Sequence, residues 1–326
     1  MLKLAIKSES WPIRGSFTIS RGSKTQVDVV VVELTDGQYR GHGECVPYAR
    51  YGESCASVIE TIYSFQPAIE QGLELAELQT LMPAGAARNA VDCAMWDLLA
   101  KKSRCSAASL AGIDSLTAQM TAYTLSLDTP EKMHLAAIDN AHYPMLKLKL
   151  AGAGDVERVT AVREGSPDAR LIVDANEGWT VETYQQIVSE LYSLGVEMIE
   201  QPLPAGKDDA LKTLDRPIPL CADESCHDSS SLIDIIGKYD MINIKLDKTG
   251  GLTEALALKQ AAQAEGLDIM VGCMLATSLA MAPAVIVAQG AKVVDLDGPL
   301  LLEKDRDQGM LFENGFIFPA TPALWG

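Results

Sequence analysis

The segment MLKLKL at residues 145–150 is the first of five short apolar runs that carry charged side chains near their ends. The other four are LIVDAN (171–176), EMIEQP (197–202), PLCADES (219–225) and MINIKLD (241–247). From Lys147 through Asp174, Glu200 and Asp223 to Lys245, the successive intervals are 27, 26, 23 and 22 residues. An interval of this size holds one strand, one helix and two loops, so the spacing predicts consecutive βα units.

The same alternation extends to both sides of these runs and predicts an α/β fold built around a (β/α)8-type barrel, a modified TIM barrel. The expected strands span residues 118–124, 145–150, 170–174, 196–200, 218–223, 240–246, 267–272 and 292–297. In a parallel barrel all strands end at one rim, where active sites are built. We therefore expect the five charged clusters to converge there, although they lie far apart in the sequence.

The first part of the chain has a different pattern, which predicts an α+β capping domain over residues 1–115. The run QVDVVVVELT at 26–35, a DG turn and a second run ending at Glu44 indicate a hairpin. Helical patterns follow at 54–71 and 84–102. We expect the barrel over residues 116–310, and we expect segment 311–326, with a hairpin around Asn314-Gly315, to return to the capping domain.

Three of the five clusters contribute a carboxylate. Asp174, Glu200 and Asp223 each end an apolar strand run. A single acid after a strand is often a helix N-cap or a solvated loop charge. Three consecutive units with the same placement instead favour a metal site, and carboxylate oxygens suit Mg²⁺. We predict one Mg²⁺ per subunit.

The remaining clusters contribute lysines. Because side chains alternate along a strand, Lys147 and Lys149 point to the same face, and Lys245 has the same phase on its own strand. Lys149 falls on the second strand and Lys245 on the sixth, which are opposite sides of an eight-stranded barrel. Burial and a nearby cation are expected to lower a lysine pKa toward neutrality, as a general base requires.

This inventory predicts a reaction. A metal ion between two opposed lysines can bind a carboxylate and stabilise the enediolate that forms when the α-proton is removed, with Lys147 adding positive charge. One lysine removes the proton from one face and the other returns a proton to the opposite face. The outcome is a 1,1-proton transfer, which is a racemisation or an epimerisation.

Composition excludes several other classes. The net charge of −17 argues against nucleic acid or an anionic membrane surface as a partner. We find no run of about 18 apolar residues, no signal-peptide pattern, and no P-loop, GxSxG or GxGxxG motif. The 7 cysteines include no CxxC pair, which favours reduced thiols. The expected location is the cytoplasm.

The motifs resemble those of the muconate-lactonizing subgroup of the enolase superfamily, for which a lysine base and an Mg²⁺-stabilised enediolate are an established pattern. The shared motifs are KLK (147–149), DAN (174–176), EQP (200–202), ADES (222–225) and NIKLDKTGG (243–251). Within that subgroup the chain is most similar to the dipeptide epimerases, in particular the bacterial L-Ala-D/L-Glu epimerases. This finer resemblance rests on ISRGS (19–23), ECVPYARYGES (44–54), GCMLATS (272–278) and DLDGP (295–299).

The resemblance implies a set of substrate contacts and a substrate. Asp295 and Asp297 would hold the ammonium group of a dipeptide, and Arg21 would bind its side-chain carboxylate. Further contacts are implied for Thr124, Lys147 and Cys273. We expect Asn176, Glu224 and Asp247 to hold the residues of the site in place without contacting the metal ion or the substrate themselves. The implied reaction interconverts L-Ala-D-Glu and L-Ala-L-Glu in peptidoglycan peptide recycling. Many family members carry an acid where this chain has Ala276-Thr277, so the resemblance does not define the seventh-strand contact.

Two alternatives remain. The first is an N-acylamino acid racemase or o-succinylbenzoate synthase of the same superfamily, whose substrates lack a free ammonium group; Asp295 and Asp297 argue against it. The second is a non-catalytic barrel used as a binding module, against which the retained lysines and acids argue. The sequence leaves the oligomeric state open, and a homo-oligomer is one of the options.

Overall fold

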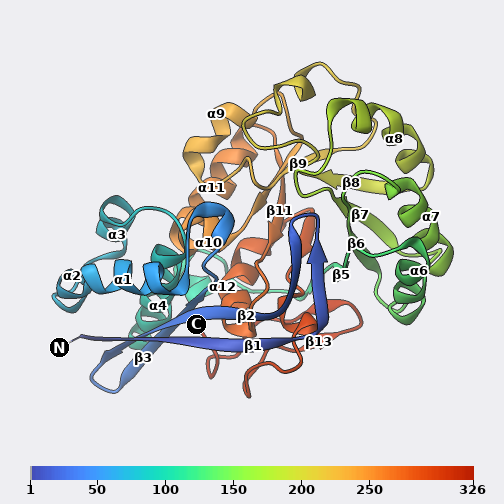
Figure 1. Cartoon of the computed structure of the whole chain (residues 1–326). Helices are drawn as coiled ribbons and strands as arrows, with labels where there is room; N and C mark the ends of the chain where they lie inside the picture. Colours follow the sequence, from blue (N-terminus) through green and yellow to red (C-terminus); the bar gives the residue numbers. More distant parts are fainter. Residues whose placement is uncertain (1) are drawn as a thin grey trace.

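The structure is a computed structural model that describes residues 2–326 (Figure 1). The chain begins with an antiparallel sheet in the order β1-β2-β3, formed by β1 (Lys3–Ile19), β2 (Gly22–Asp36) and β3 (Tyr39–Cys45). The predicted hairpin corresponds to β2 and β3. Strand β1 was not anticipated, because most of its side chains are polar or exposed. Figure 1 shows the β1–β2 hairpin bending toward the barrel.

Helices cover one face of this sheet. They are α1 (Cys55–Ser64), α2 (Gln66–Glu70), α3 (Leu75–Leu81) and α4 (Ala86–Ser103); the 3-10 helix η1 (Ala49–Tyr51) precedes them and α5 (Ala107–Leu110) follows them. Helix α4 lies directly against β3. A Cβ atom at Gly41 or Gly43 would stand 2.2 Å from Ala94 O or 2.1 Å from Ala90 O, so only glycine permits this approach.

Eight parallel strands form the barrel, in unbroken chain order from β5 to β12. They are β5 (Tyr123–Leu125), β6 (Met145–Lys149), β7 (Arg170–Asp174), β8 (Val196–Glu200), β9 (Leu220–Ala222), β10 (Met241–Ile244), β11 (Asp268–Gly272) and β12 (Val293–Asp295). Each expected strand overlaps one of these. At the seam between β12 and β5, Ala122 N donates to Val294 O at 2.9 Å and Leu296 N donates to Thr121 Oγ1 at 2.8 Å. The predicted barrel with an N-terminal α+β part is confirmed.

The outer layer of the barrel is uneven. It contains α6 (Pro130–Asp139), α7 (Asp155–Gly165), α8 (Val181–Ser193), η2 (Asp209–Lys212), η3 (Ser229–Ser231), α9 (Leu232–Ile235), α10 (Leu246–Thr249), α11 (Leu252–Ala264), α12 (Ser278–Ala288) and η4 (Gly298–Leu301). Only the short η2 connects β8 to β9, because prolines and a glycine interrupt this connection, at Pro202, Pro204, Gly206, Pro217 and Pro219. No described helix is long and apolar enough to cross a membrane.

Short strands and the chain end complete the fold. Strands β13 (Phe312–Glu313) and β14 (Phe316–Ile317) form the hairpin expected around Asn314-Gly315, and β14 pairs with β4 (Gln119–Met120). After this hairpin the chain runs to α4, where Trp325 Nε1 donates to Cys93 O at 3.1 Å. The hairpin therefore joins the barrel side, and the residues after it reach the first part of the chain.

The barrel interior is layered, and the layers place the site. A buried apolar cluster fills the end where the strands begin; it includes Met145, Ile172, Met198, Cys221, Met241, Met270 and Val293. Side chains two residues further along each strand point to the same interior. On β7, β8 and the residue after β9, that next layer consists of Asp174, Glu200 and Asp223. The apolar cluster thus closes one end of the barrel below a polar layer.

Candidate active site

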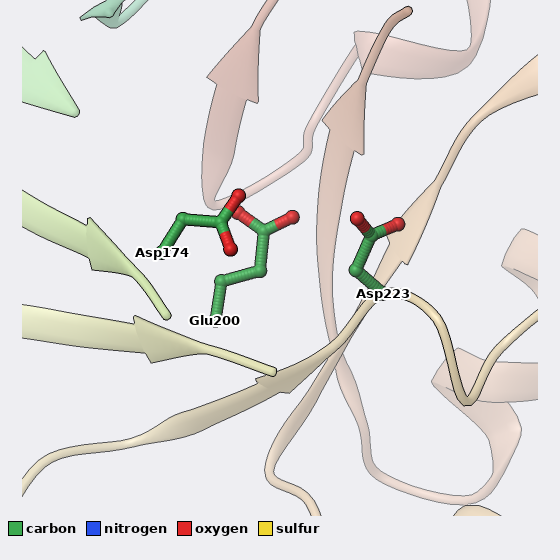
Figure 2. Close-up of side chains that lie close together, drawn as sticks. All are labelled: Asp174, Glu200 and Asp223. Carbon is green, nitrogen blue, oxygen red and sulfur yellow. The ribbon is translucent and has the colours of Figure 1, made fainter. Parts of the chain in front are cut away.

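Three carboxylates from successive strands face one another at the strand ends (Figure 2). Asp174 ends β7, Glu200 ends β8, and Asp223 directly follows β9. One oxygen from each lies within 4.8 Å of the others, and all three residues are buried. Burial alone would raise the pKa of Asp174, but Lys149 and Lys147 lower it to about 2. Burial and the charge of Asp174 raise the pKa of Glu200.

The hydrogen bonds around these acids fit a metal ion. Asn176 N donates to Asp174 Oδ1 at 2.9 Å, and Asn243 Nδ2 donates to Glu200 Oε1 at 2.7 Å. The second oxygen of Glu200 is buried and makes no well-oriented hydrogen bond. In both acids the other oxygen, Asp174 Oδ2 or Glu200 Oε2, lies 2.6 Å from a lysine ammonium. A set of three buried carboxylate oxygens matches the hard-oxygen preference of Mg²⁺.

The three predicted lysines surround this trio. Lys147 Nζ lies 2.6 Å from an oxygen of Glu200 and 2.6 Å from Asp295 Oδ2. Lys149 Nζ lies 2.6 Å from Asp174 Oδ2, and Lys245 Nζ lies 2.7 Å from Asp223 Oδ2. Lys149 ends β6 and Lys245 directly follows β10, and these two strands are four positions apart in the eight-stranded order. The two lysines therefore approach from opposite sides, with the acids between them.

Two of these lysines have a pKa shifted upward by the neighbouring carboxylates, opposite to the expected direction. Burial alone would lower the pKa of Lys147, but Asp295, Glu200 and Asp174 raise it well above its usual range. Burial would likewise lower the pKa of Lys245, and Asp223 and Glu200 outweigh it. The prediction took account of burial and a nearby cation, whereas the ion pairs with Asp295, Glu200 and Asp223 outweigh burial here.

Asp295, Asp297 and Thr124 lie together at the seam of the barrel. Thr124 N donates to Asp297 Oδ2 at 2.6 Å, and Asp295 pairs with Lys147. All three residues are at most 5% exposed. Burial and the neighbouring charge of Asp295 raise the pKa of Asp297 to about 7. The seam therefore offers two buried acids close to the lysine that contacts the carboxylate trio.

A cavity of about 480 Å³ opens between the barrel rim and the first part of the chain. Its barrel wall includes Lys149, Asp223, Lys245 and Cys273. The opposite wall is formed by the β1–β2 hairpin and the segment around η1, whose lining residues include Phe17, Ile19, Arg21, Lys24, Arg50 and Tyr51. The Lys149 ammonium lies 5.8 Å from the centre of the Phe17 ring. The hairpin thus covers the site on the side of Lys149.

Arg21 reaches this cavity but is already held by the protein. Its guanidinium donates to Glu224 Oε1 at 2.8 Å, to Tyr48 Oη at 3.1 Å and to Asn176 O at 2.9 Å. Arg50 forms two hydrogen bonds to Glu177, of 3.0 and 2.8 Å, beside it. Arg21, Lys24 and Arg50 place three cations on this wall, and the two arginines are paired with Glu224 and Glu177.

The three supporting residues have different surroundings. Asn176 donates a hydrogen bond from its backbone N–H to Asp174, and Glu224 forms an ion pair with Arg21. Asp247 faces away from the acids: it accepts from Val46 N at 3.0 Å and from Asn89 Nδ2 at 2.8 Å. It therefore connects the short helix α10 to the first part of the chain, which strand phase alone does not reveal.

Three residues of the site were not anticipated from the sequence. Lys248 is buried and donates to Asp223 Oδ1 at 2.7 Å, opposite Lys245. Asn243 holds Glu200, and Gln201 contacts the loop of Asp223. Two of them could have been found from the sequence. Lys248 is the second lysine of NIKLDKTGG and Gln201 is the glutamine of EQP, and both lie within three residues of a predicted site residue.

Comparison with known proteins identifies the class. Residues 1–112 match the N-terminal domain of mandelate racemase / muconate lactonizing enzymes, and residues 132–322 match the enolase C-terminal domain-like family. The chain therefore belongs to this family of the enolase superfamily, which confirms the resemblance drawn from its motifs.

Two curated relatives are similar over nearly the whole chain. The chain is 48% identical to an L-Ala-D/L-Glu epimerase of Escherichia coli over 317 residues, covering 97% of this chain and 99% of the relative. It is 46% identical to an N-acetyl-D-glutamate racemase of Pseudoalteromonas over 300 residues, covering 91% and 95%. These two relatives act on related acidic substrates that differ at the amino group.

Solved structures are also close. One is an enolase family member from Agrobacterium tumefaciens with homology to dipeptide epimerases, with bound sodium, L-Ala-L-Glu and an ordered loop. It is 50% identical, has a TM-score of 0.99 and matches 100% of both chains. A dipeptide epimerase from Enterococcus faecalis, in complex with Mg and L-Leu-L-Tyr, is 29% identical with a TM-score of 0.91 over 99% of both chains.

Proposed function

We propose that this protein is an Mg²⁺-dependent dipeptide epimerase that interconverts L-Ala-L-Glu and L-Ala-D-Glu. The observation that carries the proposal is the placement of Lys149 and Lys245 on opposite sides of three buried carboxylates. Inversion at a carbon atom needs one proton acceptor and one donor on opposite faces, and this arrangement supplies both.

The chain's own residues have distinct roles in this proposal. Asp174, Glu200 and Asp223 would hold the metal ion. When bound, Mg²⁺ supplies positive charge that offsets the three carboxylates, lowers the pKa of the neighbouring lysines and stabilises negative charge on the substrate carboxylate. One lysine takes the α-proton of the C-terminal residue, and the other delivers a proton to the opposite face.

Other side chains would stabilise charge and limit access by water. Lys147, within 2.6 Å of both Glu200 and Asp295, adds positive charge beside the carboxylate being activated. Phe17, Ile19 and Tyr51 line the cavity over the lysines and restrict access by water. Cys273 lines the same cavity and would contact the substrate there.

Substrate choice follows from the charges at the two ends of the site. Asp295 and Asp297, with Thr124 beside them, would bind the ammonium group of the dipeptide. The cationic wall of Arg21, Lys24 and Arg50 suits an acidic side chain on the second residue. A dipeptide that ends in glutamate carries both charges. The match to the structure solved with L-Ala-L-Glu supports this substrate.

Racemisation of N-acetylglutamate is a second candidate activity, favoured by the 46% identical relative. Such a substrate keeps both carboxylates but has no ammonium group. The buried pair Asp295 and Asp297 favours the free dipeptide, because desolvated acids are stabilised by a cationic partner.

We predict that Asp297→Asn separates these two activities. The substitution removes the charge that pairs with the dipeptide ammonium, and loss of one partner of a buried charge pair costs on the order of 2–5 kcal/mol. The value of kcat/KM for L-Ala-L-Glu should therefore fall by roughly 30-fold to several thousand-fold. N-acetylglutamate should be much less affected. Steady-state kinetics on both substrates measure this, with Asp268→Asn at the exposed start of β11 as control. Equal losses on the two substrates would instead favour the racemase.

The cellular context is also proposed. We place the protein in the cytoplasm, because all 7 cysteines are free, as expected in a reducing compartment. The small-molecule substrate would come from peptidoglycan peptide recycling, which releases dipeptides of this composition. A homo-oligomer is compatible with this activity, because the proposed site lies within one chain.

A further inference from the structure

The loops that carry the three carboxylates have unusual backbone conformations. Within residues 2–326, positive φ outside glycine occurs at five positions, and three of them are Asn176 (φ 45°), Glu177 (φ 65°) and Gln201 (φ 37°). The backbone of a residue other than glycine is strained at these φ values, and such a conformation persists only where surrounding contacts hold it. Asn176 and Glu177 follow Asp174 closely, and Gln201 directly follows Glu200. The strain is therefore concentrated beside the proposed metal ligands.

The Gln201 side chain is fully buried and binds the loop of the next ligand. Its Oε1 accepts from Asp223 N at 2.9 Å and from Ser225 N at 3.1 Å. Its Nε2 lies within hydrogen-bonding distance of Leu203 O (2.8 Å), Ser225 Oγ (2.9 Å) and Tyr239 Oη (2.9 Å). This one amide therefore joins the residues that follow β8 to the residues that follow β9.

The Gln201 backbone extends the connection to a third loop. Gln201 N donates to Cys221 O at 2.9 Å, and Gln201 O accepts from Glu177 N at 2.9 Å. Residues just after Asp174, just after Glu200 and around Asp223 are therefore all bonded to Gln201. The relative positions of the proposed metal ligands can therefore be fixed through Gln201, without direct contact between the ligands.

A buried acid fixes the orientation of the amide. Asp208 accepts from Ser225 Oγ at 2.7 Å, from Tyr239 Oη at 2.8 Å and from Lys238 Nζ at 2.7 Å. Because both hydroxyl groups donate to Asp208, they have lone pairs free to accept from Gln201 Nε2. The amide nitrogen must therefore face the hydroxyls, and the amide oxygen must face the N–H groups of Asp223 and Ser225.

We propose that Gln201 is a positioning residue that sets the separation of the metal ligands and thereby the affinity for Mg²⁺. The inference rests on the proposed function only in that it takes Asp174, Glu200 and Asp223 as the Mg²⁺ site. Gln201 acts through Glu200 and Asp223 and does not contact the substrate. An isosteric glutamate would place an oxygen against the Leu203 carbonyl and the two hydroxyl oxygens, so it should disturb the loops without leaving a cavity.

The test is the dissociation constant for Mg²⁺, measured by titration calorimetry with MgCl₂ on the whole protein. Gln201→Glu and Gln201→Ala should bind Mg²⁺ about 10–100-fold more weakly than the parent, which is the usual effect of losing a residue that supports metal ligands. At saturating Mg²⁺, kcat should recover more than the affinity does. Gln186→Ala, on the exposed surface of α8, is the matched control and should bind normally. Unchanged Mg²⁺ affinity in both folded Gln201 variants would overturn the inference.

A milder variant covers the case in which both Gln201 variants fail to fold, which melting in EDTA would reveal. Tyr239→Phe removes one hydroxyl that contacts both Gln201 and Asp208, and it should weaken Mg²⁺ binding severalfold. If it binds Mg²⁺ like the parent, the inference is overturned. The proposed function fails separately: a parent protein that binds Mg²⁺ but epimerises no dipeptide would refute the activity and leave the role of Gln201 intact.

Discussion

Replacing either Lys149 or Lys245 by alanine is expected to abolish epimerisation of L-Ala-L-Glu. Inversion needs a proton donor on each face, and each lysine is the group that reaches the site from its own side of the barrel. A positioned acid or base typically accelerates a reaction by about 10²–10⁴-fold, so kcat should fall by about this factor or more. The loss should appear in a chiral assay of the two dipeptide epimers.

The two single variants should still differ from a fully inactive protein. The lysine that remains can remove and return the α-proton on its own face, so each variant should exchange that proton of one epimer with solvent. Lys292→Ala is a suitable control, because Lys292 pairs with Asp268 at the surface. Near-native epimerisation by either variant, measured beside this control, would contradict the two-base mechanism.

Glu200→Gln is expected to have a comparably large effect through the metal site. The substitution keeps the shape of the side chain but removes the charge of one of three clustered carboxylates. We expect kcat/KM to fall by more than about 100-fold, because loss of a residue that only supports a metal ligand already costs about 10–100-fold. Chelation with EDTA should abolish activity of the parent protein, and added Mg²⁺ should restore it.

Glu197→Gln is the matched control for this prediction. Glu197 lies on the same strand, β8, but is exposed and pairs with Arg170 at the surface. Its substitution should leave kcat/KM and the Mg²⁺ requirement unchanged. Full activity of the parent in excess EDTA after metal-free preparation would refute the metal assignment.

The barrel and its polar layer could be predicted because they depend on local periodicity. Alternation along a strand places Lys147 and Lys149 on one face, and the even spacing of the acids places them on successive strands. Strand β1 lacks this signal. It is ordered by pairing with β2, and its side chains are mostly exposed.

Contacts between distant segments could not be predicted in the same way. The pairing of Arg21 with Glu224 joins residues 203 positions apart, and the bond from Asn89 to Asp247 spans 158. The direction of the lysine pKa shifts depends on distances to carboxylates, which no strand pattern gives. The role of Gln201 depends on a positive φ, which is unusual for glutamine.

The most direct test of the central claim is to follow L-Ala-L-Glu by proton NMR in D₂O with Mg²⁺ and the unmodified protein. If Lys149 and Lys245 act from opposite faces, the α-proton signal of the glutamate residue should disappear as deuterium replaces it. Signals of L-Ala-D-Glu should grow in the same period, while the α-proton of the alanine residue persists. An unchanged dipeptide spectrum, in a sample that racemises N-acetylglutamate under the same conditions, would contradict the account.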